Sequence, residues 1–168
     1  KAFLNTSLRN YSQNSNQPQT DDISGMSPYL HFGQISPIYL AHMVREFQLP
    51  DTSDPSVKED FLEELIVRRE LAANFVHFTT DYDSYDCLPE WAQKTLKEHA
   101  ADCREYIYTI DDLEQAKTHD NYWNAAMDEM NLTGFMHNYM RMYWGKKVLE
   151  WSPSPWSAYN TLMALNNK

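Results

Sequence analysis

The sequence lacks the features of a membrane or secreted protein. It contains no run of about 18 apolar residues, the length that a transmembrane helix needs, and no charged-then-apolar leader at its start. Its two cysteines, Cys87 and Cys103, are too few and too far apart for a disulfide framework or a zinc site. We therefore expect an intracellular protein, cytoplasmic in a prokaryote or nuclear in a eukaryote, in which both cysteines are reduced packing residues.

Familiar catalytic and metal-binding motifs are also missing. The six histidines form neither an HxxxH nor an HExxH arrangement, so we expect no metal. No Walker loop, dinucleotide GxGxxG motif or nucleophile elbow occurs. His31 and His119 are interpreted as satisfied structural histidines rather than as ligands.

Basic residues are few, with 14 Lys and Arg against 24 Asp and Glu and a net charge of −10. A protein that coats nucleic acid by bulk electrostatics needs clustered Lys and Arg, and this composition argues against that class. The acids concentrate in residues 51–130, however, whereas residues 131–168 carry one acid and four bases. A local basic face near the C-terminus is therefore compatible with the sequence.

The chain has helical periodicity throughout, without internal repeats or an alternating strand pattern. With 168 residues it is long enough for one sizeable core, so we expect a single all-α domain over residues 1–168. Polar loops rich in turn residues separate the helices, and Ser36 with Pro37 is a typical helix start. Residues 1–11 form an amphipathic start, and helices are predicted over residues 37–47, 58–78, 90–102, 109–117, 123–133, 135–151 and 156–168.

One predicted helix, within GFMHNYMRMYWGKKVLEW (residues 134–151), combines aromatic and polar side chains. Trp144 and Trp151 are seven residues apart and face the same way, and Asn138, Arg141 and Met142 form an adjoining stripe. Spacing alone favours an aromatic core stripe with a charged edge. Asn and Arg must be paired if they are buried, which a flat ligand with hydrogen-bonding edges or a neighbouring acidic helix would achieve.

Two further segments can be interpreted either as ordinary structure or as part of a functional site. In EELIVRRE, Glu64 and Arg68 are four residues apart and predict an ordinary surface salt bridge. In DISGMSPYLHFGQIS, Ser24 and Ser27 flank Gly25 and form either a simple turn or a cradle for phosphate.

Four motifs in order, MSPYLHFGQIS, FLEELIVRRELAANF, THDNYWNAA and MHNYMRMYWGKKVLEW, resemble the FAD-binding helical domain of DNA photolyases. The motifs look most like those of class II cyclobutane pyrimidine dimer photolyases, and the resemblance extends from Tyr11 to Lys168. The resemblance implies a lyase that uses blue light and reduced FAD to transfer an electron to a pyrimidine dimer flipped out of damaged DNA. It also implies a monomer without metal or membrane association.

The resemblance also assigns roles to individual residues. Those implied to bind FAD are Tyr11, Ser24, Ser27, Arg69, Trp123, Asn124, Asn138, Arg141 and Asn166. Those implied on the lesion side are Glu64, Arg68 and Met142. Trp123, Trp144 and Trp151 match an electron relay that photoreduces FAD, and Asn166 matches the residue facing the flavin N5.

The sequence departs from the family pattern in three respects. Ser15 stands where an Arg is expected to help with DNA or lesion contact. The N-terminal antenna domain and the C-terminal segment that closes over the flavin are expected outside this chain. Ser15 and the acidic surface favour an alternative, a cryptochrome-like flavoprotein that senses light without repair.

Overall fold

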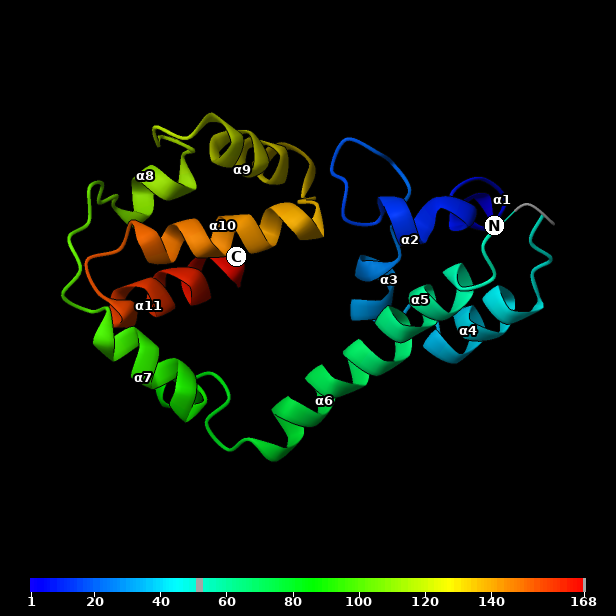
Figure 1. The fold of residues 1–168 in the computed structure, drawn as a ribbon, viewed down its shortest axis with the longest axis horizontal. Coiled ribbons are helices and arrows are strands. Elements are labelled where there is room, and N and C mark those ends of the chain that lie inside the picture. The colour runs from blue at the N-terminus through cyan, green and yellow to red at the C-terminus, as the bar shows by residue number, and fades with distance from the viewer. Residues whose placement is uncertain (51–52, 168) are drawn as a thin grey trace. The chain divides into compact units, whose positions relative to one another are not determined.

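The computed structural model describes residues 1–50 and 53–167, and within these ranges it contains helices and no strand (Figure 1). The all-α prediction is confirmed. The chain divides into two compact units, Lys1–Thr80 and Asp81–Lys168, which we describe separately. The single domain over residues 1–168 stays a prediction. Among the described residues, no helix is both long and apolar enough to cross a membrane.

The first unit consists of short helices around a core of aliphatic and aromatic side chains. Its elements are α1 (Ala2–Thr6), η1 (Leu8–Asn10), α2 (Tyr11–Asn14), α3 (Ser27–His31), α4 (Pro37–Glu46), α5 (Val57–Leu62), η2 (Glu63–Arg68) and α6 (Arg69–Phe78). Helix α5 packs against α2, η1 and α4, and it contributes Val57, Phe61 and Leu62 to the core. Leu8 is completely buried there.

Local signals set the helix boundaries in this unit. Helix α4 begins as predicted, because the Ser36 hydroxyl accepts a hydrogen bond from the Tyr39 N–H at 3.4 Å and Pro37 occupies the first turn. The predicted helix over residues 58–78 is also present, but its middle segment, η2, is a π-helix. A π-helical turn places residues five apart, rather than four apart, above one another.

The second unit is built around α10, which packs against α9 and α11 (Figure 1). Its elements are η3 (Tyr85–Cys87), α7 (Glu90–Glu98), α8 (Ile110–Glu114), α9 (Asn121–Thr133), α10 (Asn138–Glu150) and α11 (Pro155–Asn166). Its core contains Trp123, Trp144 and Trp151 together with Leu113 and Val148.

Capping determines where these helices start and stop. Thr109 and Asp112 form a complete capping box at the start of α8. Gly134 ends α9 in the left-handed conformation, with φ of 73°. The next helix therefore starts at Asn138, three residues later than predicted, after the N-cap His137.

Both cysteines are free, as expected, but only one of them is partly buried. The Cys87 thiol donates a hydrogen bond to the Tyr82 carbonyl at 3.3 Å. Cys103 is exposed, so its predicted packing role is wrong. It lies in the irregular segment between α7 and α8, which contributes little to the core.

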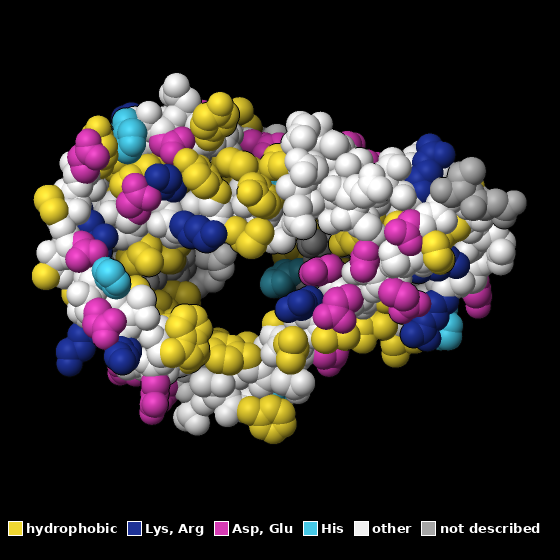
Figure 2. Space-filling model, in the orientation of Figure 1, with side chains coloured by type: hydrophobic (Ala, Val, Ile, Leu, Met, Phe, Trp, Pro, Cys, Tyr) yellow, Lys and Arg dark blue, Asp and Glu magenta, His cyan; other side chains and the backbone are white. Residues whose placement is uncertain are grey.

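The surface combines apolar and charged side chains. Leu71, Phe75 and Phe78 of α6 and Trp91 of α7 are all exposed. On the face drawn in Figure 2, acidic and basic side chains alternate and do not form a single basic field. This face therefore agrees with the low basic content of the sequence.

Two glycines of the second unit give a test of its backbone. Gly134→Ala introduces a Cβ that meets no other atom within 4 Å, so its effect comes only from the positive φ. We expect it to lower the free energy of unfolding by about 1 kcal/mol. Gly145→Ala, inside α10, adds a Cβ 3.8 Å from Leu162 Cδ2, an ordinary packing distance. Because Ala favours the helix more than Gly does, we expect the free energy of unfolding to rise by up to about 1 kcal/mol.

Urea unfolding followed by tryptophan fluorescence measures both effects, since all five tryptophans belong to the second unit. Changes of the same sign in the two variants would contradict the assigned backbone conformations.

Candidate functional site

A hollow of about 440 Å³ in the first unit collects several of the predicted site residues. Ser27 reaches it from α3, Glu64 from η2 and Arg69 from the start of α6. Its lining also includes His31 and three apolar residues. An apolar wall with a few convergent polar groups is the usual composition of a small-molecule site.

The π-helical segment decides which charged groups face this hollow. The predicted salt bridge between Glu64 and Arg68 is absent, because Arg68 Nε instead pairs with Glu63 Oε1 at 3.5 Å. These partners are five residues apart, the spacing of a π-helical turn. Glu64 and Arg69 are also five residues apart, and both line the hollow. The π-helical turn therefore places a carboxylate and a guanidinium at one site.

Tyr11 packs against the core of the unit and does not line the hollow. Its ring lies edge-on to Phe61, with centroids 5.3 Å apart, and edge-on to Phe3 at 6.0 Å. Burial, together with the nearby carboxylates of Glu64 and Asp60, raises the pKa of Tyr11 to about 12. The phenol therefore stays protonated at neutral pH and available as a hydrogen-bond donor.

The remaining predicted residues of this unit lie in the turn before α3 and at the end of α2. The Ser24 hydroxyl accepts a hydrogen bond from the Met26 N–H at 3.3 Å, as in a simple Ser turn. Gly25, between the two, has φ of 62°. Ser15 is half-buried, and its N–H donates to the Tyr11 carbonyl at 2.8 Å.

The second unit brings the three predicted relay tryptophans into one cluster. Trp123 is stacked near-parallel to Trp144, with ring centroids 6.5 Å apart, and lies edge-on to Trp151 at 5.6 Å. The Trp123 indole N–H donates to the Trp144 carbonyl at 3.3 Å. All three rings are buried, so Trp123 connects the other two within the core.

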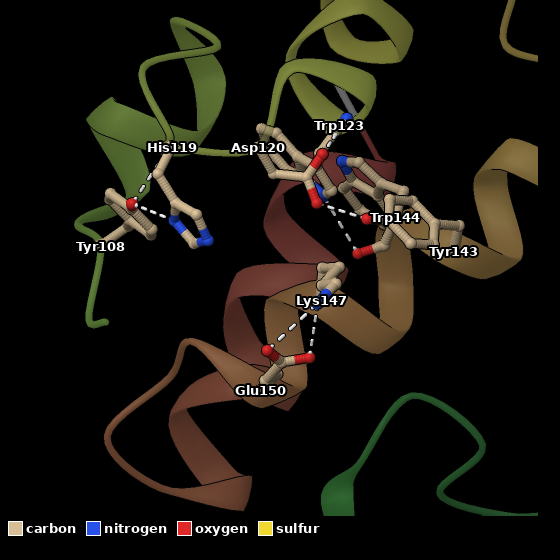
Figure 3. A network of polar contacts seen from close by, with 8 residues as sticks. All are labelled: Tyr108, His119, Asp120, Trp123, Tyr143, Trp144, Lys147 and Glu150. Atoms are coloured by element: carbon tan, nitrogen blue, oxygen red, sulfur yellow. Dashed lines mark hydrogen bonds and ion pairs between the residues drawn. The ribbon is translucent and has the colours of Figure 1, made fainter. Parts of the chain in front are cut away.

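Asp120 fixes the position of this cluster from one end of α9. One carboxylate oxygen accepts hydrogen bonds from the N–H groups of Tyr122 and Trp123, both at 3.0 Å. The other accepts a short hydrogen bond from the Tyr143 hydroxyl of α10 (Figure 3). Burial alone would raise the pKa of Asp120, but these hydrogen bonds outweigh it and lower that pKa. The same bond to Asp120 raises the pKa of Tyr143 to about 12.

A cation lies beside the aromatic cluster. The Lys147 ammonium is 5.8 Å from the Tyr143 ring centroid and 5.6 Å from that of Trp151. It also forms an ion pair with Glu150 at 2.9 Å (Figure 3). This cation raises the energy of any positive charge formed on the Trp151 ring.

The polar residues predicted to contact a flat ligand mostly lie on exposed surface. Asn138, Arg141 and Met142 are all exposed on α10, and Asn166 is exposed at the end of α11. Among the described residues, none hydrogen-bonds or pairs with the side chains of Asn138, Arg141 or Asn166. Because they are exposed, they need no internal partner, and they are free to contact a ligand.

Asn124 differs from the other predicted FAD residues, because its side chain already has partners. Its carbonyl oxygen accepts from the Thr118 N–H at 3.1 Å and from the Thr118 hydroxyl at 2.7 Å. Its amide donates to the Thr118 carbonyl at 2.8 Å. Asn124 therefore holds the loop before α9 in place.

Sequence reasoning missed several groups that the structure places at these sites. His31 was interpreted as structural, yet it is exposed and lines the hollow. The Asp120–Tyr143 bond joins residues 23 apart, and the only sequence signal was an Asp at a helix start. Nothing in the local pattern signals the π-helical turn.

No family model matches this all-helical chain. It is similar to three proteins named deoxyribodipyrimidine photo-lyase. The identity is 54% with the protein of Methanothermobacter thermautotrophicus, 47% with that of Arabidopsis thaliana and 39% with that of Potorous tridactylus. These alignments cover 99%, 99% and 100% of this chain.

The chain is therefore similar over its whole length to one part of these three proteins. It spans only 36%, 33% and 31% of the length of these three relatives. The relatives' names denote light-dependent lyases acting on deoxyribodipyrimidines.

Replacement of Tyr143 tests the electrostatics of the cluster. Tyr143→Phe removes the hydrogen bond that lowers the pKa of Asp120. We expect the free energy of unfolding at neutral pH to fall by at most about 1 kcal/mol, because partial exposure of this pair to solvent weakens the bond. A lowered carboxylate pKa stabilises the fold above the unfolded value of 3.8, and this contribution disappears as pH falls below it. The difference between wild type and variant should therefore shrink below about pH 4.

Urea unfolding at several pH values measures this difference. Tyr139→Phe is the matched control, because Tyr139 is exposed on the same helix and its hydroxyl has no partner among the described residues. A wild-type–Tyr143→Phe difference that does not depend on pH would contradict the assigned bond.

Proposed function

We propose that the full-length protein containing this chain is a deoxyribodipyrimidine photolyase, an enzyme that uses light to repair pyrimidine dimers in DNA. The observation that carries the proposal is the hollow, where Ser27, Glu64 and Arg69 converge. Ser27 and Arg69 were expected to bind FAD and Glu64 to face the lesion, and all three line this one hollow. The homology to proteins named photo-lyase supports the same conclusion and does not favour the light-sensing alternative.

The residues present fit FAD by their donor chemistry. Arg69 and Ser27 offer hydrogen-bond donors of the kind that bind phosphate, and Arg141 and Asn138 carry exposed polar groups without internal partners. We propose that FAD is held by these four with Tyr11, Ser24, Trp123, Asn124 and Asn166. When bound, the flavin supplies the light-absorbing group and the transferred electron. Trp123 is completely buried, and the Asn124 side chain bonds to Thr118.

On the DNA side, we propose that Glu64, Arg68 and Met142 contact the dimer. A base lesion inside a duplex must be extruded, and a damaged pair is the least costly to unstack. The Glu64 carboxyl group has no ion-pair partner among the described residues, so it can hydrogen-bond the pyrimidine edges. Arg68 is exposed and pairs with Glu63 over 3.5 Å, and it can exchange that pair for a DNA phosphate.

The buried cluster supports a second role, the delivery of electrons to the flavin before repair. Trp123 joins Trp144 and Trp151 through ring contacts of 6.5 and 5.6 Å. Such contacts give a continuous aromatic path through the core. We propose this path as the photoreduction relay, and it supports assignment of the chain to the FAD-binding domain of a class II enzyme.

Blue-light repair of dimer-containing oligonucleotide by the full-length protein with FAD tests the enzyme proposal. Glu64→Gln should keep the yellow colour of bound flavin but lower the repair yield about tenfold or more, because a carboxyl group is lost at the lesion. Unchanged dimer content in the wild-type reaction would reject the proposal.

Glu63→Gln is the matched control for this variant. Glu63 is the neighbouring carboxylate, it pairs with Arg68, and it does not line the hollow. We expect its repair yield to stay near that of wild type. Loss of flavin from Glu64→Gln would instead assign Glu64 to cofactor binding or folding.

Trp144→Phe separates the relay from repair. We expect it to abolish photoreduction of oxidised flavin while enzyme reduced beforehand by dithionite repairs dimers almost normally, since the relay acts only before repair. Trp156→Phe is the control, because Trp156 is 64% exposed and outside the cluster. Equal losses of both activities in Trp144→Phe would make Trp144 a structural residue.

A further inference from the structure

We propose that His137 is a positioning residue for the repair reaction, because it fixes the start of α10 only while its imidazole is neutral. The first two turns of α10 carry Asn138, Arg141 and Met142. The proposed function gives these three residues their contacts with FAD and the dimer, so this inference rests on it. His137 itself does not belong to the set that the family resemblance assigned.

His137 is buried and is bonded twice to the start of α10. It is only 4% exposed. Its Nδ1 accepts a hydrogen bond from the Tyr139 N–H at 3.2 Å, and its carbonyl accepts one from the Arg141 N–H at 2.9 Å. The Tyr139 N–H is one of the first N–H groups of a helix, which have no acceptor within the helix. His137 therefore sets where α10 begins and ties that point to buried structure.

The cap requires a neutral imidazole. Nδ1 accepts a hydrogen bond only when it carries no hydrogen, so the ring hydrogen is on Nε2. Nε2 is buried and has no hydrogen-bond partner among the described residues. An imidazolium would carry a second N–H, on Nδ1, directed at the Tyr139 N–H. Two buried donors without acceptors are strongly unfavourable, so protonation breaks the cap.

The electrostatic surroundings of His137 also oppose its protonation. The start of α10 is the positive end of the helix dipole, and the first charged side chain of the helix is the cation Arg141. Burial lowers the pKa of His137 below its ordinary value of 6.5 and outweighs the opposite effect of Glu129 on α9. Glu129 is exposed, so water and salt screen its charge. No other titratable group among the described residues shifts this pKa.

A titratable cap distinguishes α10 from the other α-helices that the structure describes with a side-chain cap. Helices α4, α8, α9 and α11 are capped by Ser36, Thr109, Asp120 and Ser154. None of these side chains changes its charge near neutral pH. The one cap that does so precedes the turn proposed to meet flavin and lesion.

The consequence is a repair reaction that weakens in acid. The unfolded chain takes up the proton first, so stability falls as the pH drops below 6.5. The folded cap is almost complete above about pH 7.5 and is lost as the pH falls through the lower folded pKa. Without the cap, the first turn of α10 is no longer fixed, and its side chains lose their defined positions.

Dimer repair by the full-length holoprotein, reduced beforehand with dithionite, tests this inference from about pH 5.5 to about pH 8. His137→Asn keeps an acceptor for the Tyr139 N–H and does not titrate, so we expect repair near the wild-type level at the upper pH without the acid decline. His137→Leu removes the cap, and we expect kcat/KM to fall about fivefold at every pH. His99→Asn, the same substitution at an exposed histidine of the second unit, should keep the wild-type decline.

Hydrogen exchange of residues 135–145 in the same samples reports the cap without repair. After correction for the intrinsic pH dependence of exchange, wild type should lose protection in acid. His137→Asn should keep it, and His137→Leu should lack it at every pH. Flavin absorbance of each sample checks that the variants are folded and loaded.

An acid decline in His137→Asn equal to that of wild type would overturn this inference and leave the proposed function intact. Wild-type repair and protection in His137→Leu would do the same. Absence of repair by wild type at the upper pH, with flavin bound and residues 135–145 protected, would overturn the proposed function and with it the role of His137 in repair.

Discussion

The Asp120 carboxylate is the interaction on which the second unit depends most. It caps α9 through two backbone N–H groups and holds α10 through the Tyr143 hydroxyl. One side chain therefore fixes both the start of α9, where Trp123 lies in the first turn, and the rotation of α10, which carries Trp144. Hydrophobic packing alone does not fix the orientation of large rings. A hydrogen bond needs defined distances and angles, so the bonds to Asp120 fix how the tryptophan rings are arranged.

A different constraint shapes the first unit. The π-helical turn of η2 inserts an extra residue into the helix, and this interrupts the regular α-helical hydrogen-bond pattern. In return, Glu64 and Arg69 line one hollow, while Arg68 pairs with Glu63 outside it. A regular α-helix would place Glu64 above Arg68 and favour a salt bridge that neutralises both. The irregular turn therefore leaves the Glu64 carboxylate without an ion-pair partner among the described residues, whereas Arg69 pairs with Glu70 at 2.9 Å.

Burial divides the groups of the proposed enzyme into two kinds. Groups proposed to contact FAD and DNA, such as Arg141 and Met142, are exposed and keep their polar or polarisable ends available. The proposed relay tryptophans are buried, where rigid packing holds their rings at short and constant distances. The Tyr108–His119 pair joins these environments, because its phenol touches the buried cluster and its imidazole faces solvent.

The sequence by itself determined the helical class and most helix positions, because apolar periodicity and caps such as Ser36 and Thr109 act within a few residues of chain. It also indicated the tryptophans that cluster, though helix spacing alone suggested that Trp144 and Trp151 simply share a face. Only the tertiary structure placed Trp123 between them, paired Tyr143 with Asp120 and brought His119 to Tyr108. It alone revealed the π-helical turn that replaced the expected Glu64–Arg68 pair. These features depend on contacts between distant residues, and local propensity carries no information about them.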